Sequence, residues 1–133
     1  MTSVYRDDDG YADIQYCRLI FNTGPTPTGL SGVYVIYDQV ANKLYLRNDA
    51  NTASLGGYAP GSANVIENSY CKLYCAETTK SGSGNSLTIN WKIEFKQPLA
   101  DKTPPGGTLK AWMCVADKIG AASGWVTKGG YTF

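Results

Sequence analysis

The sequence predicts an all-β protein, an antiparallel two-sheet β-sandwich of about seven to nine strands. The first observation is a regular alternation of apolar and polar side chains over residues 86–95. The second is a series of segments rich in β-branched and aromatic residues, and the third is the Gly, Pro, Asn and Ser clusters between them. Two facing sheets satisfy this pattern, because each strand then buries every second side chain.

Residues 86–95 carry the clearest strand signal. One face of this segment consists of Leu87, Ile89, Trp91, Ile93 and Phe95. The side chains between them are polar, and a helix would spread the apolar residues around its whole circumference. The alternation therefore predicts a single strand and places Trp91 in the core, in a structural role.

The other strands are expected at intervals along the chain, separated by turn residues. They are residues 3–6 as a short edge strand, 14–22, 33–38, 43–48, 69–75, 109–116 and 125–133. The short link between 33–38 and 43–48 predicts an antiparallel hairpin, and Gly129 and Gly130 predict a bulge or turn in the last strand. Residues 51–68 are weakly patterned, and we expect them to form a long connection between the two sheets.

Length and charge set the class of protein. The chain has 133 residues, which predicts one domain spanning residues 1–133. It is 43% hydrophobic and 17% charged, and no apolar run approaches the roughly 20 residues that a membrane-spanning helix needs. The formal net charge is +1, with 12 basic and 11 acidic residues. We therefore expect neither membrane insertion nor a nucleic-acid partner.

The absence of histidine argues against catalysis. The chain contains no His, which removes the commonest general base and the commonest metal ligand. The glutamates are Glu67, Glu77 and Glu94, and a glycosidase needs two carboxylates facing each other across a cleft, about 5 to 10 Å apart. A small sandwich with short loops offers few such clefts, so we expect the protein not to be an enzyme.

Composition also predicts where the protein acts. The sequence is rich in Tyr and Gly, as secreted β-proteins are. It begins at Met1 without a charged segment followed by an apolar run. The chain is therefore either cytoplasmic or a domain excised from a longer exported protein, and the composition favours the second, a secreted or cell-surface location.

Cysteine usage is consistent with export but leaves the pairing open. Cys17 and Cys114 stand alone, and Cys71 and Cys75 are four residues apart, a distribution that does not favour a zinc site. One or two structural disulfides, or buried thiols, are the alternatives. Cys71 and Cys75 cannot pair within a straight strand, where they would lie about 13 Å apart.

The C-terminal third resembles a known kind of module. Residues 111–117 read Ala-Trp-Met-Cys-Val-Ala-Asp, and Gly120 and the Ser-Gly-Trp of residues 123–125 follow. This pattern resembles the last hairpin of bacterial immunoglobulin-like and fibronectin type III-like modules. Residues 42–69 also resemble a module that is repeated in large secreted bacterial proteins.

The resemblance implies an immunoglobulin-like sandwich on the bacterial surface, usually non-catalytic and placed beside enzymes or adhesins. By analogy it implies a disulfide between Cys17 and Cys114. The alternation disagrees, because Cys114 shares a face with Trp112 rather than with Met113 and Val115. Pairing of Cys17 with Cys71 or Cys75 is an equal alternative.

Aromatic and polar residues form a candidate carbohydrate platform. Flat rings stack on the C–H faces of sugars, while amides, carboxylates and guanidinium groups bond the hydroxyls. The candidate ligand-binding residues are Trp112, Trp125, Tyr45, Arg47, Asn48 and Asp49. The alternative is cross-strand aromatic packing on a half-exposed sheet.

An acidic loop supplies candidate calcium ligands, the only cofactor that the sequence suggests. These are Asp7, Asp9 and Asp13, and Asp49, Asp101 and Asp117 are candidates to join them from neighbouring loops. Calcium takes six to eight oxygen ligands, often from flexible acidic loops. A solvated acidic turn is the alternative.

Two functions follow from these features. The first is a carbohydrate-binding or adhesive module, whose partners are a polysaccharide or glycan and the neighbouring domains of a larger exported protein. The second is a structural immunoglobulin-like spacer or a self-assembling surface fibre subunit with no small-molecule ligand.

Overall fold

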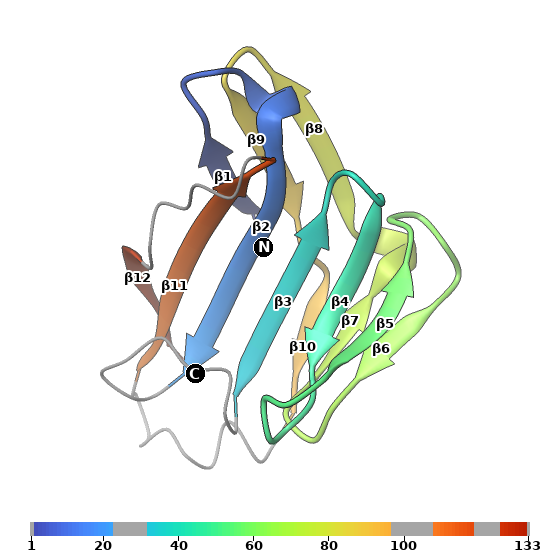
Figure 1. Cartoon of the computed structure of the whole chain (residues 1–133). Helices are drawn as coiled ribbons and strands as arrows, with labels where there is room; N and C mark the ends of the chain where they lie inside the picture. Colours follow the sequence, from blue (N-terminus) through green and yellow to red (C-terminus); the bar gives the residue numbers. More distant parts are fainter. Residues whose placement is uncertain (1, 23–31, 97–107, 119–125, 133) are drawn as a thin grey trace.

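The structure is a computed structural model that describes residues 2–22, 32–96, 108–118 and 126–132 (Figure 1). Within these ranges the regular structure consists of strands and two short 3₁₀ turns. The strands are β1 Thr2–Arg6, β2 Ile14–Asn22, β3 Val33–Asp38, β4 Lys43–Arg47, β5 Ser54–Tyr58, β6 Val65–Glu67, β7 Cys71–Tyr74, β8 Thr79–Ser83, β9 Ser86–Asn90, β10 Ile93–Phe95, β11 Thr108–Asp117 and β12 Val126–Thr132. The 3₁₀ turns are η1 Tyr11–Asp13 and η2 Cys75–Glu77. The predicted all-β class is confirmed, but the described residues already form twelve strands, more than the seven to nine predicted.

In the part of the chain that the structure describes, the strands form three antiparallel sheets arranged in two layers. One layer is a six-stranded sheet with the order β12-β11-β2-β3-β4-β5. The sheets β1-β9-β8 and β10-β7-β6 lie behind it in Figure 1 and make up the second layer. Every pairing between the described strands is antiparallel, so the architecture is that of a β-sandwich.

The core lies between the two layers. From the six-stranded sheet it takes Cys17, Leu19, Phe21, Val33, Val35, Tyr37, Leu44, Leu46 and Ala111. From the second layer it takes Tyr5, Ile66, Cys71, Leu73, Cys75, Leu87, Ile89 and Trp91. Strands β3, β4, β7 and β9 contribute alternate side chains to the core, which is why the sequence shows a two-residue rhythm there. The indole of Trp91 is buried, as predicted, and donates a hydrogen bond of 2.7 Å to the hydroxyl of Ser3.

Most predicted strands agree closely with the structure. Residues 14–22 and 33–38 coincide with β2 and β3, and β3 and β4 form the predicted hairpin. The last strand pairs with β11, with a register shift opposite residues 128–129 that fits the predicted bulge.

The predicted single strand over residues 86–95 is instead two strands. β9 ends at Asn90 in one small sheet, and β10 begins at Ile93 in the other. Between them, Lys92 N–H donates to the hydroxyl of Thr78 at 3.1 Å, and Lys92 C=O accepts from Tyr74 N–H at 2.9 Å. The backbone of Lys92 therefore leaves one ladder for the other without exposing unpaired groups in the interior.

Two segments predicted as connections contain strands. Residues 51–68 do run from one layer to the other, but they include the edge strands β5 and β6. The Ser-Gly-rich residues 79–83 form β8, beside β9. A Cβ atom at Gly82 would lie 2.2 Å from the ring of Tyr11, so glycine is required there for packing and does not mark a loop.

The disulfide prediction is not supported. All four cysteines are free and buried. The pairing of Cys17 with Cys114 fails because Cys17 lies opposite Val115 in the core, whereas Cys114 lies opposite Arg18 on the other face of the sheet. Burial raises the pKa of the Cys71 thiol to about 12 and also raises the pKa of Cys17 and Cys75. These thiols are therefore protonated at neutral pH and unreactive.

Candidate functional site

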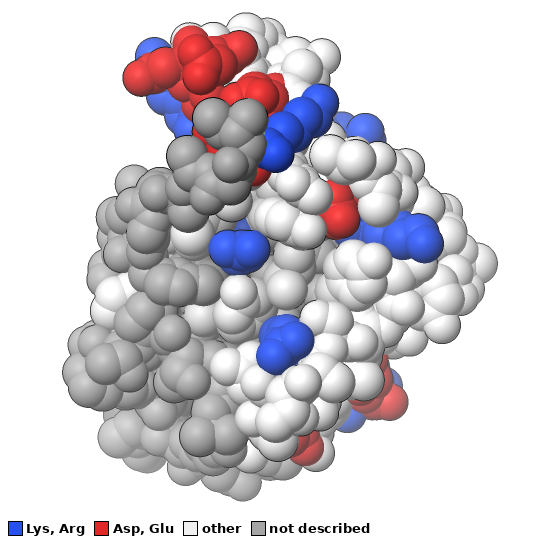
Figure 2. Space-filling view, viewed as in Figure 1, with Lys and Arg blue, Asp and Glu red and all other residues white. Residues whose placement is uncertain are grey.

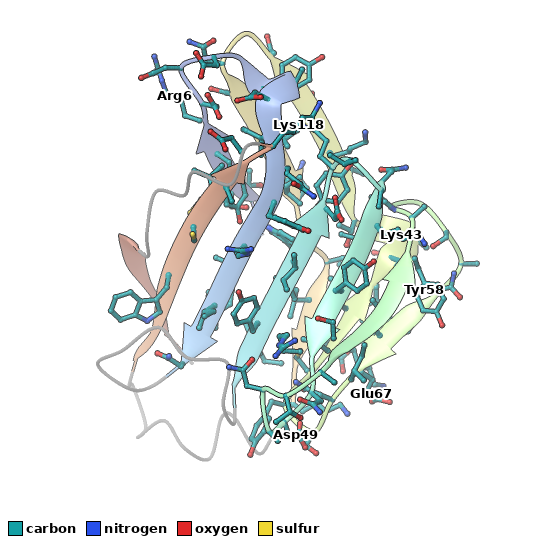
Figure 3. The ribbon with its side chains drawn as sticks, in the orientation of Figure 1. Arg6, Lys43, Asp49, Tyr58, Glu67 and Lys118 are labelled. Atoms are coloured by element: carbon teal, nitrogen blue, oxygen red, sulfur yellow. The ribbon has the colours of Figure 1, made fainter. Side chains whose placement is uncertain are left out.

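The six-stranded sheet has a second face, turned away from the core, which we call the outer face. Successive residues of a strand point to opposite sides, so the neighbours of the core residues in β2, β3, β4 and β11 lie on it. Its central residues are Tyr16, Arg18, Ile20, Tyr34, Ile36, Tyr45, Arg47, Trp112 and Cys114. Figure 3 shows ring and guanidinium groups standing in front of these strands.

A shallow depression of about 330 Å³ lies in the middle of the outer face. It is lined by Tyr16, Arg18, Tyr34, Ile36, Arg47 and Asn51. The strand register explains why these residues lie together. Arg18 of β2 is paired with Ile36 of β3, and Tyr34 lies two residues before Ile36, on the same face of β3. The lining combines aromatic rings with two cations.

Arg18 has unused hydrogen-bonding capacity. Within the part of the chain that the structure describes, its guanidinium makes no hydrogen bond or ion pair. Its contact is with the ring of Tyr16, whose centroid lies 5.0 Å from the guanidinium carbon. The strand beneath is anchored from the core side, because buried Tyr5 donates a hydrogen bond of 3.0 Å to the carbonyl of Arg18.

Arg47 is held in place by the turn that follows β4. Its Nε and Nη2 donate to the side-chain and backbone oxygens of Asn51, both at 2.9 Å, and Nη1 donates to Ser54 Oγ at 3.2 Å. Asn51 has a φ of 55°, a left-handed conformation that asparagine tolerates in turns. Arg47 therefore presents a rigid positive charge at the rim of the depression.

Tyr34 lies between the two arginines. Burial raises its pKa, and the charges of Arg18 and Arg47 oppose that rise. Both cations are therefore close enough to act on one phenol, and both would also act on a bound anionic group.

Two further aromatic residues extend the outer face. Trp112 is half-buried and donates from its indole nitrogen to Asn22 Oδ1 at 3.1 Å, which fixes the plane of the ring. The ring of Tyr45 lies against Gly57, where a Cβ atom would be 3.4 Å from the ring and where φ is +92°. Glycine there allows both the backbone conformation and the close approach.

No protein-family model matches this chain, and no curated protein or solved structure is significantly similar to it. Among the described residues, none belongs to a helix with the length and apolar character needed to cross a membrane.

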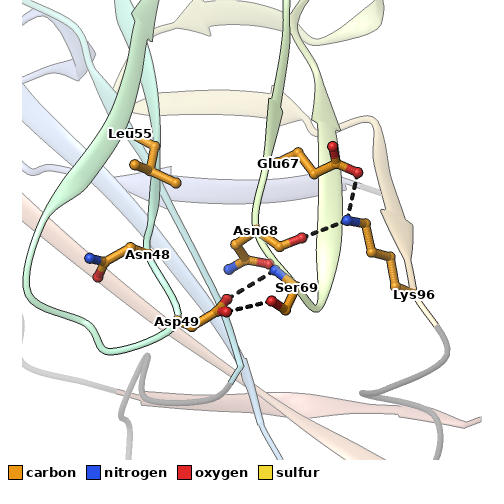
Figure 4. A pocket seen from close by; sticks show the side chains of 7 residues that line it. All are labelled: Asn48, Asp49, Leu55, Glu67, Asn68, Ser69 and Lys96. Atoms are coloured by element: carbon orange, nitrogen blue, oxygen red, sulfur yellow. Dashed lines mark hydrogen bonds and ion pairs between the residues drawn. The ribbon is translucent and has the colours of Figure 1, made fainter.

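The predicted platform is divided by the fold. Trp112, Tyr45 and Arg47 share the outer face, whereas Asn48 and Asp49 line a separate polar pocket of about 370 Å³ (Figure 4). Trp125, the remaining predicted member, lies outside the described residues.

The polar pocket is bonded internally. Both oxygens of Asp49 accept hydrogen bonds from Ser69, at 2.9 Å from its N–H and 2.5 Å from its hydroxyl. Lys96 donates to the carbonyl of Asn68 at 2.6 Å and pairs with Glu67 at 2.5 Å, which lowers the pKa of that carboxyl. The bonds of Asp49 join the turn after β4 to the turn before β7, and the contacts of Lys96 join that second turn to the end of β10, so both have a structural role.

The acidic loop forms a cluster at one end of the sheet, where red side chains gather in Figure 2. Carboxylate oxygens of Asp7, Asp13 and Asp117 lie within 4.8 Å of one another. Asp9 is not in this group, and its N–H donates to Asp7 at 2.8 Å. Desolvation, followed by repulsion from Asp7 and Asp117, raises the pKa of Asp13. Three carboxylates supply part of a calcium shell, so calcium binding stays a prediction.

Sequence reasoning missed the centre of the outer face. Tyr16 and Arg18 were not among the predicted site residues, although the signal was present. They alternate with Cys17 and Leu19, so once those residues are assigned to the core, Tyr16 and Arg18 must face outward.

Proposed function

We propose that this chain is a non-catalytic, exported β-sandwich module that binds carbohydrate on the outer face of its six-stranded sheet. The observation that carries the proposal is the depression lined by Tyr16, Arg18, Tyr34 and Arg47, with Trp112 and Tyr45 on the same sheet face. An open, shallow surface with rings and hydrogen-bond donors suits an extended polysaccharide better than a small molecule, which needs an enclosing cavity.

The fixed orientation of the aromatic side chains supports the proposal. Trp112 is held by Asn22, and Tyr45 lies against the backbone at Gly57. A ring that is already immobile loses little conformational entropy when a sugar stacks on it. Asn48 and Asp49 are left out of the proposed site, because their oxygens serve neighbouring segments.

The immunoglobulin-like character and the bacterial surface location are part of the same proposal. They are supported by the C-terminal sequence pattern, and the antiparallel β11–β12 hairpin is compatible with it. The buried, protonated thiols are compatible with an oxidising compartment, because burial protects them from reaction.

A glycan array tests the proposal, with the parent protein compared with Trp112→Ala and Tyr45→Ala. Each substitution should weaken binding about five- to thirty-fold, the factor that corresponds to about 1 to 2 kcal/mol for a central aromatic contact. The matched control is Tyr58→Ala, since Tyr58 is exposed on edge strand β5 (Figure 3).

Binding that is lost in the two variants at an unchanged melting temperature would support the proposal. Absence of binding to every glycan, together with self-association in sizing chromatography, would instead favour a fibre subunit. Repeating the array with a chelator shows whether a metal ion contributes.

A further inference from the structure

We infer that the ligand of the outer face is an acidic saccharide, whose carboxylate or sulfate group is bound by Arg18. The inference rests on the proposed function and narrows it from carbohydrate in general to one chemical class. The lining of the depression carries an excess of positive charge, from Arg18 and Arg47.

The described residues that line the depression include two cations and no anion. Arg18 and Arg47 line it, and none of its other lining residues is acidic. Asp38 lies next to the depression on the same face, paired with Tyr16 of β2 and with Lys43 of β4, whose opposite charge offsets its own. The chain as a whole carries only +1. The positive potential is therefore local, and it would attract an anionic group to this part of the surface.

Arg18 supplies the free donors. A guanidinium carries five N–H donors in a planar fork that matches a carboxylate or sulfate with two parallel hydrogen bonds. Among the described residues, none of the five is used. In Arg47, by contrast, three guanidinium nitrogens already donate hydrogen bonds to Asn51 and Ser54. Arg18 is therefore the anion-binding residue, and Arg47 adds a fixed positive charge.

The surroundings hold Arg18 ready for a sugar. Its guanidinium stacks on the ring of Tyr16, which restricts the long side chain. Tyr34 and Ile36 provide the adjacent apolar surface. The rings can contact the C–H face of a pyranose while Arg18 binds its charged substituent. A neutral sugar would leave the guanidinium without an anionic partner and would lose the stronger, charge-assisted bonds.

Matched pairs of polysaccharides test the inference. Binding is measured by calorimetry to polygalacturonate and its carboxyl-reduced form, and to dextran sulfate and dextran, which separates the carboxylate source from the sulfate source. The parent protein should bind one acidic member at least about tenfold more tightly than its neutral counterpart. The preference should shrink as salt is raised, because exposed charges are screened.

Substitutions assign the effect to Arg18. Arg18→Gln should abolish the preference for the acidic polymer while retaining binding to the neutral one, and Arg18→Lys should keep part of the preference because it keeps the charge but loses the fork. Arg6→Gln is the matched control, since Arg6 is an exposed arginine on β1 and its loss changes the net charge equally. This control should retain the full preference.

The outcomes separate the two proposals. Equal binding of acidic and neutral polymers, lost in Trp112→Ala, would overturn this inference and leave carbohydrate binding intact. A preference that survives in Arg18→Gln would also overturn it. Binding to none of the four polymers would count against both. Tighter binding of a single-stranded oligonucleotide than of any polysaccharide, dependent on Arg18, would replace the saccharide by a nucleic acid.

Discussion

Asn68 joins three segments of the fold, and its substitution should be among the most damaging in the chain. The residue lies in the turn between β6 and β7 and is buried. Its Oδ1 accepts hydrogen bonds from the N–H groups of Tyr70 and Cys71, at 2.8 and 2.9 Å. Its Nδ2 donates to the carbonyls of Arg47 at 3.1 Å and Gly32 at 3.4 Å. The side chain thus ties the second layer to the end of β4 and the approach to β3.

The expected cost follows from these bonds. Three are of ordinary length, and each contributes about 1 kcal/mol net, so Asn68→Ala should destabilise the protein by about 3 kcal/mol. The bond to Gly32 is long and adds little. Backbone groups left unpaired in the interior would raise the cost rather than lower it.

Asn68→Asp gives a second, pH-dependent result. A carboxylate at this position would still accept the hydrogen bonds from Tyr70 and Cys71. Its second oxygen, however, would replace the Nδ2 donor and face the carbonyl oxygen of Arg47, so the pKa of the new carboxyl should be raised. Its protonated form can donate to that carbonyl. The stability of this variant should therefore be greatest at low pH and should fall as the pH rises through the raised pKa.

Urea denaturation followed by tryptophan fluorescence measures both effects, since Trp91 is buried in the folded state. Asn85→Ala is the control, because Asn85 is an exposed asparagine between β8 and β9. A loss below about 1 kcal/mol in Asn68→Ala would show that the asparagine does not hold the layers together. A pH-independent Asn68→Asp variant would refute the assignment of Nδ2 as the donor to Arg47.

Two further predictions concern ionisation and the thiols. Since desolvation and the nearby Asp7 and Asp117 raise the pKa of Asp13, its ionisation opposes folding, and that penalty disappears as the pH falls below the folded pKa. Asp13→Asn should therefore raise the melting temperature slightly at neutral pH and leave it unchanged in acid. Asp8→Asn is the control, because the side chain of Asp8 is 95% exposed, and it should leave the melting temperature unchanged at both pH values. A lower melting temperature of Asp13→Asn at neutral pH would contradict the repulsion between these carboxylates. Ellman's reagent should label no cysteine in the folded protein and all four after denaturation without a reductant, because the thiols are free and buried. A smaller total after denaturation would indicate a disulfide.

The local sequence pattern predicted most strands. It missed strands that form because of contacts with distant parts of the chain. β3 and β4 each bury one face, so their alternation is readable from the chain. In β2 the core residues Cys17, Leu19 and Phe21 alternate in the same way, although Ile20 and Asn22 between and beyond them are buried as well. All residues of β8 are exposed, and the strand forms because it pairs with β9 and because Gly82 accommodates the ring of Tyr11. The break at Lys92 is invisible in the alternation, since Ile93 and Phe95 stay in phase with Trp91 and still pack against the core.

The candidate site shows the same division. It was predictable that Trp112, Tyr45 and Arg47 lie on the face turned away from the core. Their neighbours along the strands point into the core, and successive side chains of a strand point to opposite faces. The separation of Asn48 and Asp49 from these residues was not, since it depends on contacts with Ser69 and with the backbone of the turn, some of them twenty residues away.

The amino-acid order specified which side of most strands faces the core, because burial of every second side chain produces an alternation that can be recognised within a few residues. It thereby determined the all-β class, the buried Trp91 and the outward direction of Tyr16, Arg18 and Trp112. Only the tertiary structure decided which residues of the outer face become neighbours and which of their hydrogen-bond donors are already used within the protein. Strand order brings Arg18 and Arg47 to one depression, where hydrogen bonds to the adjoining turn occupy Arg47 while Arg18 makes none among the described residues. Pairing between distant strands depends on the packing of whole sheets, which no local pattern encodes.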